Sequence, residues 1–251
     1  MAQQKGIIPL RGTIGNITFY KSKDGFMAKE KSGLNGDRIA KDPAFQRTRE
    51  NGAEFGRAGK AGKVLRTALR SLLQNMSDSR MIPRLTKEMM KVIQADQVSE
   101  RGSRNVIDGE TELLTGFEFN VNSKLGTTLY APYTSEIDRA SGQLTVNILP
   151  FVPLNMVAAP AGTTHFKITS AAAEIDFENQ TYVISIKSTA ELLWNSSATD
   201  EINHVNAVTV NSTHPLFLVL GIEFFQQVNN AMYSLKNGAF NSLALVKVSG
   251  V

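Results

Sequence analysis

The sequence contains no cysteine and only three histidines in 251 residues. The lack of cysteine excludes disulfides, thiolate metal sites and cysteine nucleophiles. His165, His204 and His214 are widely separated, and none has a partner at a metal-binding spacing such as His-x-x-x-His. A structural role is therefore expected for each histidine. We predict no bound metal and no cofactor.

Long apolar runs are also absent. The densest run, residues 215–225, is interrupted by Glu223 and falls short of the ~20 residues that span a bilayer. The first ten residues lack the apolar core, about 7–15 residues long, of a signal peptide. We expect no membrane span and synthesis in the cytoplasm. A place in an extracellular particle or filament stays open.

Recognisable catalytic motifs are missing. The stretch Gly59–Lys63 resembles a phosphate loop, but that motif requires glycine where Arg57 stands and serine or threonine where Val64 stands. No Gly-x-Ser-x-Gly or Gly-x-Gly-x-x-Gly pattern occurs. We therefore predict that the protein is not an enzyme and expect no small-molecule ligand.

Two pairs of carboxylates are the remaining candidates for chemistry. Glu110 and Glu112 form one pair, and Glu136 and Asp138 form the other. Paired carboxylates can serve glycoside hydrolysis, but no neighbouring residues predict a substrate cleft. A solvated turn is the favoured interpretation of both pairs.

Charge is divided unevenly along the chain. Residues 1–105 carry 21 Lys and Arg against 10 Asp and Glu, a formal balance of +11, whereas residues 106–251 carry 6 against 13, a balance of −7. Such asymmetry indicates either a basic surface for a polyanion or two complementary faces that meet. The faces could meet within one subunit or between neighbouring subunits.

The amino-terminal segment predicts a β-hairpin. Residues 17–20 and 26–29 are strand-like and flank Asp24-Gly25, which suits a tight turn. Because an isolated hairpin is marginal in water, this one must add to a sheet or lie on a partner. Residues 31–42 contain few apolar side chains, and a loop or flexible arm is expected there.

Two helices are predicted next. Asp42 can cap free backbone amides while Pro43 suits the first helical position. The early part of the first helix contains four glycines, which indicate close approach by another element, a bend, or a helix tolerated by its context; they are Gly52, Gly56, Gly59 and Gly62. Apolar residues then recur at helical spacing: Leu65, Ala68, Leu69, Leu72, Leu73 and Met76.

The second helix follows Pro83. Its expected apolar face contains Ile82, Leu85, Met89, Val92 and Ile93, with the methionines filling the core.

Basic residues recur along the first helix and form the candidate contact for a polyanion or for another subunit. They are Arg47, Arg49, Arg57, Lys60, Lys63, Arg66 and Arg70. Spacings of three or four place several of them on one face. Glu50 and Glu54 interrupt this series, and the nearby Phe45 and Phe55 have no period suited to stacking single-stranded bases.

The acidic part of the chain predicts many short strands. The expected strands are residues 114–121, 127–130, 144–149, 165–170, 174–177, 182–187, 207–210, 216–226, 232–235 and 242–248. Turn signals separate several of them, and Asn237-Gly238 is expected to form a closing hairpin between the last two. This spacing favours a β-sandwich or barrel.

The predicted fold class is α+β, with an amino-terminal hairpin or arm and a helical pair, followed by a mainly antiparallel β-sandwich body of jelly-roll-like form. Three domains are expected: a hairpin and extended arm (1–41), a basic helical region (42–105) and an acidic β-sandwich (106–251).

Two stretches, residues 12–25 and 42–55, resemble a group of uncharacterised Bacteroidota proteins. The resemblance covers about the first hundred residues well and the remainder loosely. The second stretch, in which Asp-Pro is followed by Gln, Arg and Phe, is also similar to the helix start of phage-type and mobile-element structural proteins. The resemblance implies a component of a virion, a tail-like structure or a filament, and it carries no catalytic residues.

The favoured hypothesis is a homo-oligomeric structural subunit whose amino-terminal arm docks on a neighbouring copy. The alternative is a nucleic-acid-binding or packaging protein that uses the basic helices. A third hypothesis, a carbohydrate- or protein-binding module with Trp194 as its platform, rests on fold analogy alone, and core packing is the more ordinary role for that residue.

Overall fold

The computed structural model describes residues 2–5, 8–30 and 36–250. The chain divides into two compact units, Met1–Arg49 and Glu50–Val251, which are described separately. Helices are combined with antiparallel sheets, so the α+β class predicted from the sequence is confirmed. The finer jelly-roll form and the boundaries at residues 41/42 and 105/106 stay predictions.

The amino-terminal unit contains a small antiparallel sheet with the order β1-β4-β3-β2. Its strands are β1 (Ala2–Gln3), β2 (Gly12–Ile14), β3 (Ile17–Ser22) and β4 (Gly25–Glu30). The predicted hairpin is confirmed, because β3 pairs with β4 from Ile17↔Glu30 to Ser22↔Gly25. Gly25 has a φ of 110°, a conformation that side chains with a Cβ rarely adopt. The short outer strands β1 and β2 were not predicted.

Part of the expected loop is helical. Residues 36–41 form α1 (Gly36–Lys41), and residues 31–35 of the expected loop or arm lie outside the described residues. Asp37 in the first turn of α1 and Lys41 in the last turn complement the helix dipole, which propensity alone did not indicate. The prediction of a loop over 31–42 is therefore wrong for α1.

The predicted helix start at Asp42 is confirmed. Its carboxylate accepts a hydrogen bond from the Ala44 amide at 2.9 Å, across the short 3-10 helix η1 (Pro43–Phe45). This bond, together with the neighbouring Arg38, lowers the pKa of Asp42. The chain then continues as α2 (Gln46–Ala68).

The described part of the body contains most of α2 and four further α-helices: α3 (Arg70–Leu73), α4 (Met81–Gln94), and the single turns α5 (Leu125–Thr128) and α6 (Pro153–Met156). The predicted apolar positions of the first helical segment are buried, although the helix breaks at Leu69 between α2 and α3. A Cβ on Gly62 would contact Leu85 at 3.7 Å, whereas one on the other three glycines of α2 would meet no atom within 4 Å. Most of these glycines are therefore tolerated by their context rather than required.

In α4, Leu85 and Met89 are buried as predicted, but Ile82 is 50% exposed. The assignment of Ile82 to the buried face is wrong. The helix begins at Met81, and Met81 takes the buried position at its start.

The body contains two sheets. The larger, six-stranded sheet has the order β12-β11-β7-β8, with β13 beside β11 and β9 beside β7. Its strands are β7 (His165–Asp176), β8 (Thr181–Ser188), β9 (Leu192–Leu193), β11 (Leu216–Val228), β12 (Ala231–Ser234) and β13 (Ser242–Ser249). The smaller sheet has the order β10-β6-β5, with β5 (Tyr133–Asp138), β6 (Gln143–Ile148) and β10 (Ile202–Ala207).

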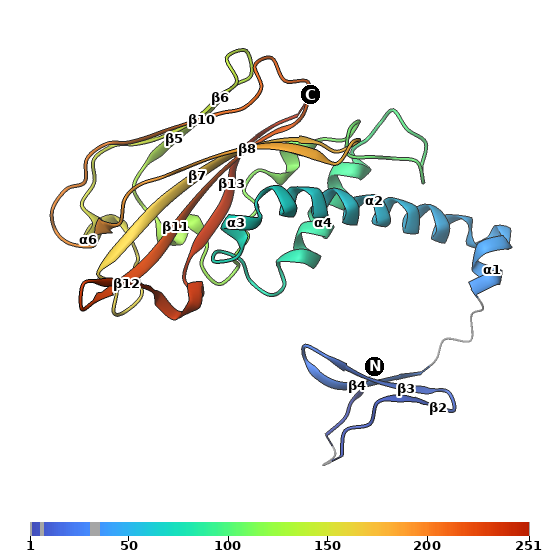
Figure 1. Ribbon diagram of the computed structural model, residues 1–251. Helices are drawn as coiled ribbons and strands as arrows, with labels where there is room; N and C mark the ends of the chain where they lie inside the picture. Colours follow the sequence, from blue (N-terminus) through green and yellow to red (C-terminus); the bar gives the residue numbers. More distant parts are fainter. Residues whose placement is uncertain (1, 6–7, 31–35, 251) are drawn as a thin grey trace. The chain divides into compact units, whose positions relative to one another are not determined.

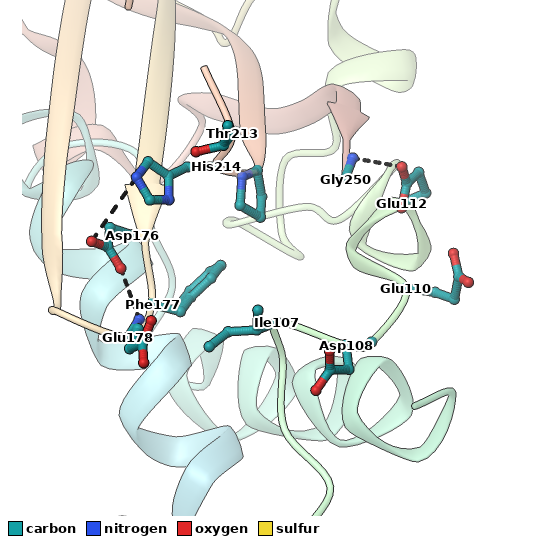
Figure 2. Close-up of a pocket in the computed structure, with 12 residues that line it drawn as sticks. Ile107, Asp108, Glu110, Glu112, Asp176, Phe177, Glu178, Thr213, His214 and Gly250 are labelled. Carbon is teal, nitrogen blue, oxygen red and sulfur yellow. Dashed lines mark hydrogen bonds and ion pairs between the residues drawn. The ribbon is translucent and has the colours of Figure 1, made fainter. Parts of the chain in front are cut away.

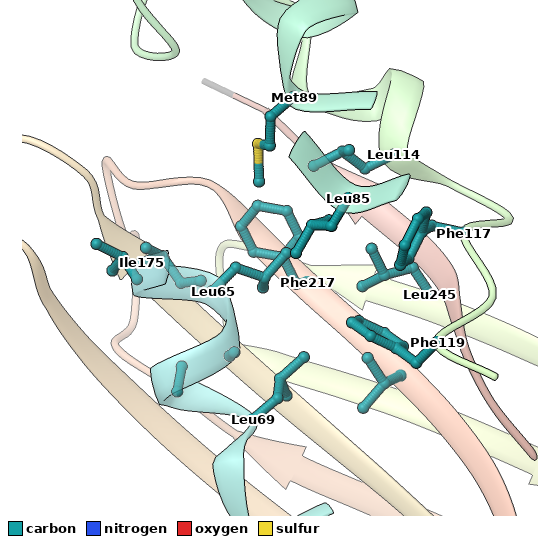
Figure 3. Close-up of a cluster of buried hydrophobic side chains, with 14 of the residues drawn as sticks. Leu65, Leu69, Leu85, Met89, Leu114, Phe117, Phe119, Ile175, Phe217 and Leu245 are labelled. Carbon is teal, nitrogen blue, oxygen red and sulfur yellow. The ribbon is translucent and has the colours of Figure 1, made fainter. Parts of the chain in front are cut away.

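The larger sheet is covered on both faces (Figure 1). Alternate residues of β11 point to opposite sides, as the period of a strand requires. Phe217 and Val219 join the apolar cluster that includes the helices, part of which Figure 3 shows. Leu218 and Leu220 join a second cluster with the smaller sheet. Both clusters lie in residues 50–251, so the body has its own core.

Three predicted strands are wrong. Of residues 207–210, only Ala207 is in a strand, at the end of β10, because the amides of Val208 and Thr209 donate to Gly142 and Glu174 outside the sheet ladder. Residues 114–121 are an irregular segment that follows the 3-10 helix η2 (Thr111–Leu114), because Leu114, Phe117 and Phe119 are each buried against the helices and β13. Residues 127–130 overlap the helical turn α5 (Leu125–Thr128), in which two threonine hydroxyls donate to the Lys124 carbonyl.

The predicted closing hairpin is also wrong. Asn237 and Gly238 have φ values of 50° and 78°, but they end the 3-10 helix η3 (Leu235–Gly238). β12 and β13 both pair with β11, at its residues 225–228 and 216–222, rather than with each other. The two strands predicted at 165–170 and 174–177 form the single strand β7, and β5 was not predicted.

Candidate functional site

The predicted basic residues have different environments. In the amino-terminal unit, Arg47 is exposed. Arg49 is half-buried, and its guanidinium donates to the carbonyls of Ile39 at 2.8 Å and Asp42 at 2.9 Å. Arg49 therefore fixes the start of α2.

Two basic residues of the body are also held by backbone carbonyls. Arg57 donates to the carbonyl of Gly102 at 2.8 and 2.6 Å. Arg66 donates to the carbonyl of Gly62 at 3.2 Å. Both side chains are half-buried, so they have less freedom to contact a partner than the sequence pattern indicated.

The three remaining residues, Lys60, Lys63 and Arg70, are exposed. Lys60 and Lys63 are three residues apart and share one side of α2, whereas Arg70 begins α3 beyond the break at Leu69. The two acidic residues that interrupt the series contact the loop after α4. Glu54 is buried and accepts a hydrogen bond from the Gly102 amide at 2.8 Å, and Glu50 lies 3.6 Å from Arg101. Lys60, Lys63 and Arg70 are therefore the predicted basic residues of the body that stay accessible.

An acidic pocket of about 480 Å³ lies in the body, and sequence analysis did not identify it (Figure 2). Five carboxylates line it, and its described lining residues include no lysine or arginine. Three come from the segment around η2 and two from the end of β7; they are Asp108, Glu110, Glu112, Asp176 and Glu178. His214 lies on the side between these two groups, and Pro215 also lines the pocket.

Asp176 is the best-defined carboxylate of the pocket. It accepts hydrogen bonds from the amides of Glu178 and Asn179, each at 2.9 Å. The bonds from Asn179 are the main reason that the pKa of Asp176 is lowered. His214 Nε2 lies 4.0 Å from Asp176 Oδ2. Asp176 is thus ionised at neutral pH, and the pocket carries negative charge.

Arg139 fixes the wall of the pocket that contains His214 and Gly250. One terminal nitrogen of its guanidinium donates to the carbonyls of Ser212 at 2.7 Å and His214 at 2.8 Å. The other donates to Ser249 and to the Gly250 carbonyl, the latter at 2.5 Å. The Gly250 amide in turn donates to Glu112 at 2.5 Å. The end of β13 is therefore tied to both sides of the pocket.

The pocket can attract a cationic group by charge. Within the described residues, no three His, Cys, Asp or Glu side chains are placed to hold a metal ion. Of the two predicted carboxylate pairs, Glu110 and Glu112 lie at the pocket, whereas Glu136 and Asp138 lie on β5 away from it. Asp138 instead accepts a hydrogen bond from the Ser141 hydroxyl at 2.6 Å in the following turn.

A serine and a histidine meet elsewhere, inside the body. Ser170 Oγ lies 3.0 Å from His204 Nδ1, and the Asn206 amide donates to Ser170 at 2.8 Å. Ser170 and Asn206 are 0% exposed. A substrate cannot reach this serine, so the three residues form an interior polar cluster. His165 contacts Thr164 and is buried, and Trp194 packs on the apolar cluster between the sheets.

The pocket was missed because its residues come together only through the fold. The sequence showed the pair Glu110 and Glu112 and an acidic surplus after residue 105, but their proximity to Asp176 and His214 depends on the end of β7.

No helix in the described part of the chain is long and apolar enough to cross a bilayer. No family model, curated protein or solved structure matches the chain.

Proposed function

We propose that this protein is a non-enzymatic structural subunit that assembles with copies of itself, as a component of a filament, a tail-like structure or a virion shell. The proposal rests mainly on the amino-terminal sheet, which consists of β1, β2, β3 and β4. No described residue of these four strands is buried. Ordering a chain costs about 1–2 kcal/mol per residue, which apolar burial must offset. A neighbouring copy that covers this sheet supplies that burial.

Opposed charge supports the same proposal. The acidic pocket and the exposed basic side chains Lys60, Lys63 and Arg70 both belong to the body. Contacts between unlike surfaces of identical subunits generate rings or filaments. The resemblance to phage-type structural proteins is in keeping with such a role. In this proposal the body is a jelly-roll-like β-sandwich whose two sheets enclose the cluster around Leu144 and Leu218.

The proposal is tested by deleting residues 1–41 and comparing the variant with the full chain by electron microscopy and light scattering. The full chain is expected to form large assemblies that lose order on deletion. The body is expected to stay folded, because both apolar clusters lie in residues 50–251. Circular dichroism of the deletion variant provides that control. Equal assemblies with and without residues 1–41 would contradict the proposed role of the sheet.

A second candidate function is nucleic-acid binding by α2 and α3, favoured by the exposure of Lys60, Lys63 and Arg70. Changing all three to alanine should weaken binding to labelled duplex DNA or RNA and reduce the dependence of affinity on salt. Lys87→Ala, an exposed change on α4, is the matched control. No binding at low salt eliminates this candidate.

A further inference from the structure

The amino-terminal sheet has one apolar face, which we call the apolar sheet face. Paired residues of antiparallel strands point to the same side. The registers Ile14↔Ile17, Phe19↔Ala28 and Lys21↔Phe26 therefore place these residues together. The members of the apolar sheet face are Ala2, Gly12, Ile14, Ile17, Phe19, Lys21, Phe26, Ala28 and Glu30. The opposite face contains the polar or mixed residues Thr13, Thr18, Tyr20, Met27 and Lys29.

The apolar sheet face is partly exposed: Phe19 and Phe26 are half-buried, whereas its two isoleucines are exposed. Ile14 is 64% exposed and Ile17 is 46% exposed. A shallow groove lies at the Glu30 end of this face; it is lined by Ala2, Asn16, Ile17, Ala28, Lys29 and Glu30. Apolar side chains gathered on one face of a small sheet normally pack against a second layer. The face therefore needs an occupant.

The two ends of the apolar sheet face carry opposite charges. Lys21 Nζ lies 5.6 Å from the centre of the Phe26 ring, and the Arg11 guanidinium lies 5.7 Å from the same ring. Glu30 lies at the other end, opposite Ile17. Because Ile17 precedes Lys21 by four residues on β3, the positive and negative ends are about 13 Å apart.

We propose that the apolar sheet face packs on the same face of a second copy, with the strands of the two copies running in opposite directions and Lys21 of each copy facing Glu30 of the other. This inference rests on the self-assembly proposed above and names the surface that mediates it. A two-fold axis lying across the strands brings unlike ends together. An axis along the strands would bring Lys21 near Lys21, and like charges in contact are unfavourable.

Packing through the face fits the sheet better than joining through its edges. The outer strands β1 and β2 contain two and three residues. Short edge strands offer few backbone groups for an added strand. The apolar side chains, in contrast, extend across all four strands.

The expected contact is small. Four strands of up to six residues make a face of roughly 20 by 20 Å, or about 400 Å² per copy. A stable pair usually buries about 800 Å² per partner. The face-to-face contact is therefore one of several contacts that hold the assembly together. Its contribution is measured by the protein concentration at which assemblies form.

The test uses full-length charge-reversal variants in sedimentation experiments at low salt. Lys21→Glu alone and Glu30→Lys alone each place like charges in contact and should raise the concentration needed for assembly by about tenfold. An equimolar mixture of the two variants pairs unlike charges again and should assemble like the wild type. The double variant K21E/E30K should do so by itself.

Lys87→Glu is the matched control. Lys87 is an exposed lysine of α4 in the body, so the same charge reversal there leaves the apolar sheet face unchanged. This variant should assemble at the wild-type concentration. Two single variants that fail alone and still fail when mixed would overturn the face-to-face contact while leaving self-assembly intact. An equal effect of Lys87→Glu would overturn it as well. A wild-type protein that is monomeric would instead contradict the proposed function.

Discussion

Arg57 and Gly102 are joined by two hydrogen bonds, from the guanidinium of the arginine to the carbonyl oxygen of the glycine, at 2.8 and 2.6 Å. The amide of the same glycine donates to Glu54 at 2.8 Å. Both backbone groups of Gly102 are thus bound by residues one turn apart on α2. A residue that belonged to the candidate contact surface in the sequence therefore connects the helix to the loop after α4.

Replacing Arg57 by alanine should destabilise the body, because the carbonyl of Gly102 loses a charged donor. The expected loss is about 1.5–3 kcal/mol in the free energy of unfolding. Lys60→Ala, on the same helix but exposed, should change stability by less than about 0.5 kcal/mol. Urea unfolding of both variants gives the comparison. Equal stabilities would show that the Arg57 contact contributes nothing.

Truncating Leu85 should be far more costly than truncating its neighbour Ile82. Leu85 is 0% exposed and lies in the apolar cluster between the helices and the sheet, whereas Ile82 is half-exposed. Leu85→Ala is expected to lower the free energy of unfolding by about 2–5 kcal/mol. Ile82→Ala should cost less than about 1 kcal/mol. Similar losses in chemical unfolding would contradict the orientation of α4.

Replacing Arg139 should loosen the end of β13. This side chain donates to carbonyls of Ser212, His214, Ser249 and Gly250. Arg139→Gln removes the charge and most of these bonds, and a loss of about 1.5–3 kcal/mol is expected. Hydrogen exchange should accelerate at residues 242–249. Unchanged exchange there would mean that pairing with β11 alone holds the strand.

Stability should decrease as the pH falls below about 6.5, the ordinary pKa of histidine. Burial, with a smaller effect of Lys187, lowers the pKa of His204 in the folded protein. Between the folded and unfolded pKa values the unfolded chain binds the proton more readily, so stability is complete above the unfolded pKa and falls toward the folded one. Thermal unfolding of His204→Gln between pH 5 and 8 should show a weaker dependence. An identical slope would assign the effect to other groups.

Local sequence patterns predicted an element correctly where its residues favour one backbone conformation or one buried face for a direct physical reason. The hairpin at Gly25, the cap at Asp42 and the buried stripe around Leu65 all follow from turn chemistry, capping and helical period. The long strand β11 was recognised from its continuous apolar residues.

The failures arise where the fold overrides the local pattern. Phe117 and Phe119 look like strand residues but are buried from an irregular segment. Asn237-Gly238 looks like a hairpin turn, but the strands on either side of it pair with β11. The acidic pocket combines residues around 108–112, 176 and 214, and no local period could predict their proximity. The sequence likewise could not show which of the predicted basic residues are accessible. Arg57, for example, is held by Gly102, which lies in a loop far along the chain.

The central claim, that this chain assembles with itself, is tested most directly by the molar mass of the purified full-length protein from light scattering at low and at high salt. Assembly through opposed charges predicts a mass many times the 27.4 kDa of one chain at low salt, and a smaller mass at high salt because counter-ions screen the contacts. A uniform species of 27.4 kDa in both conditions would contradict the account.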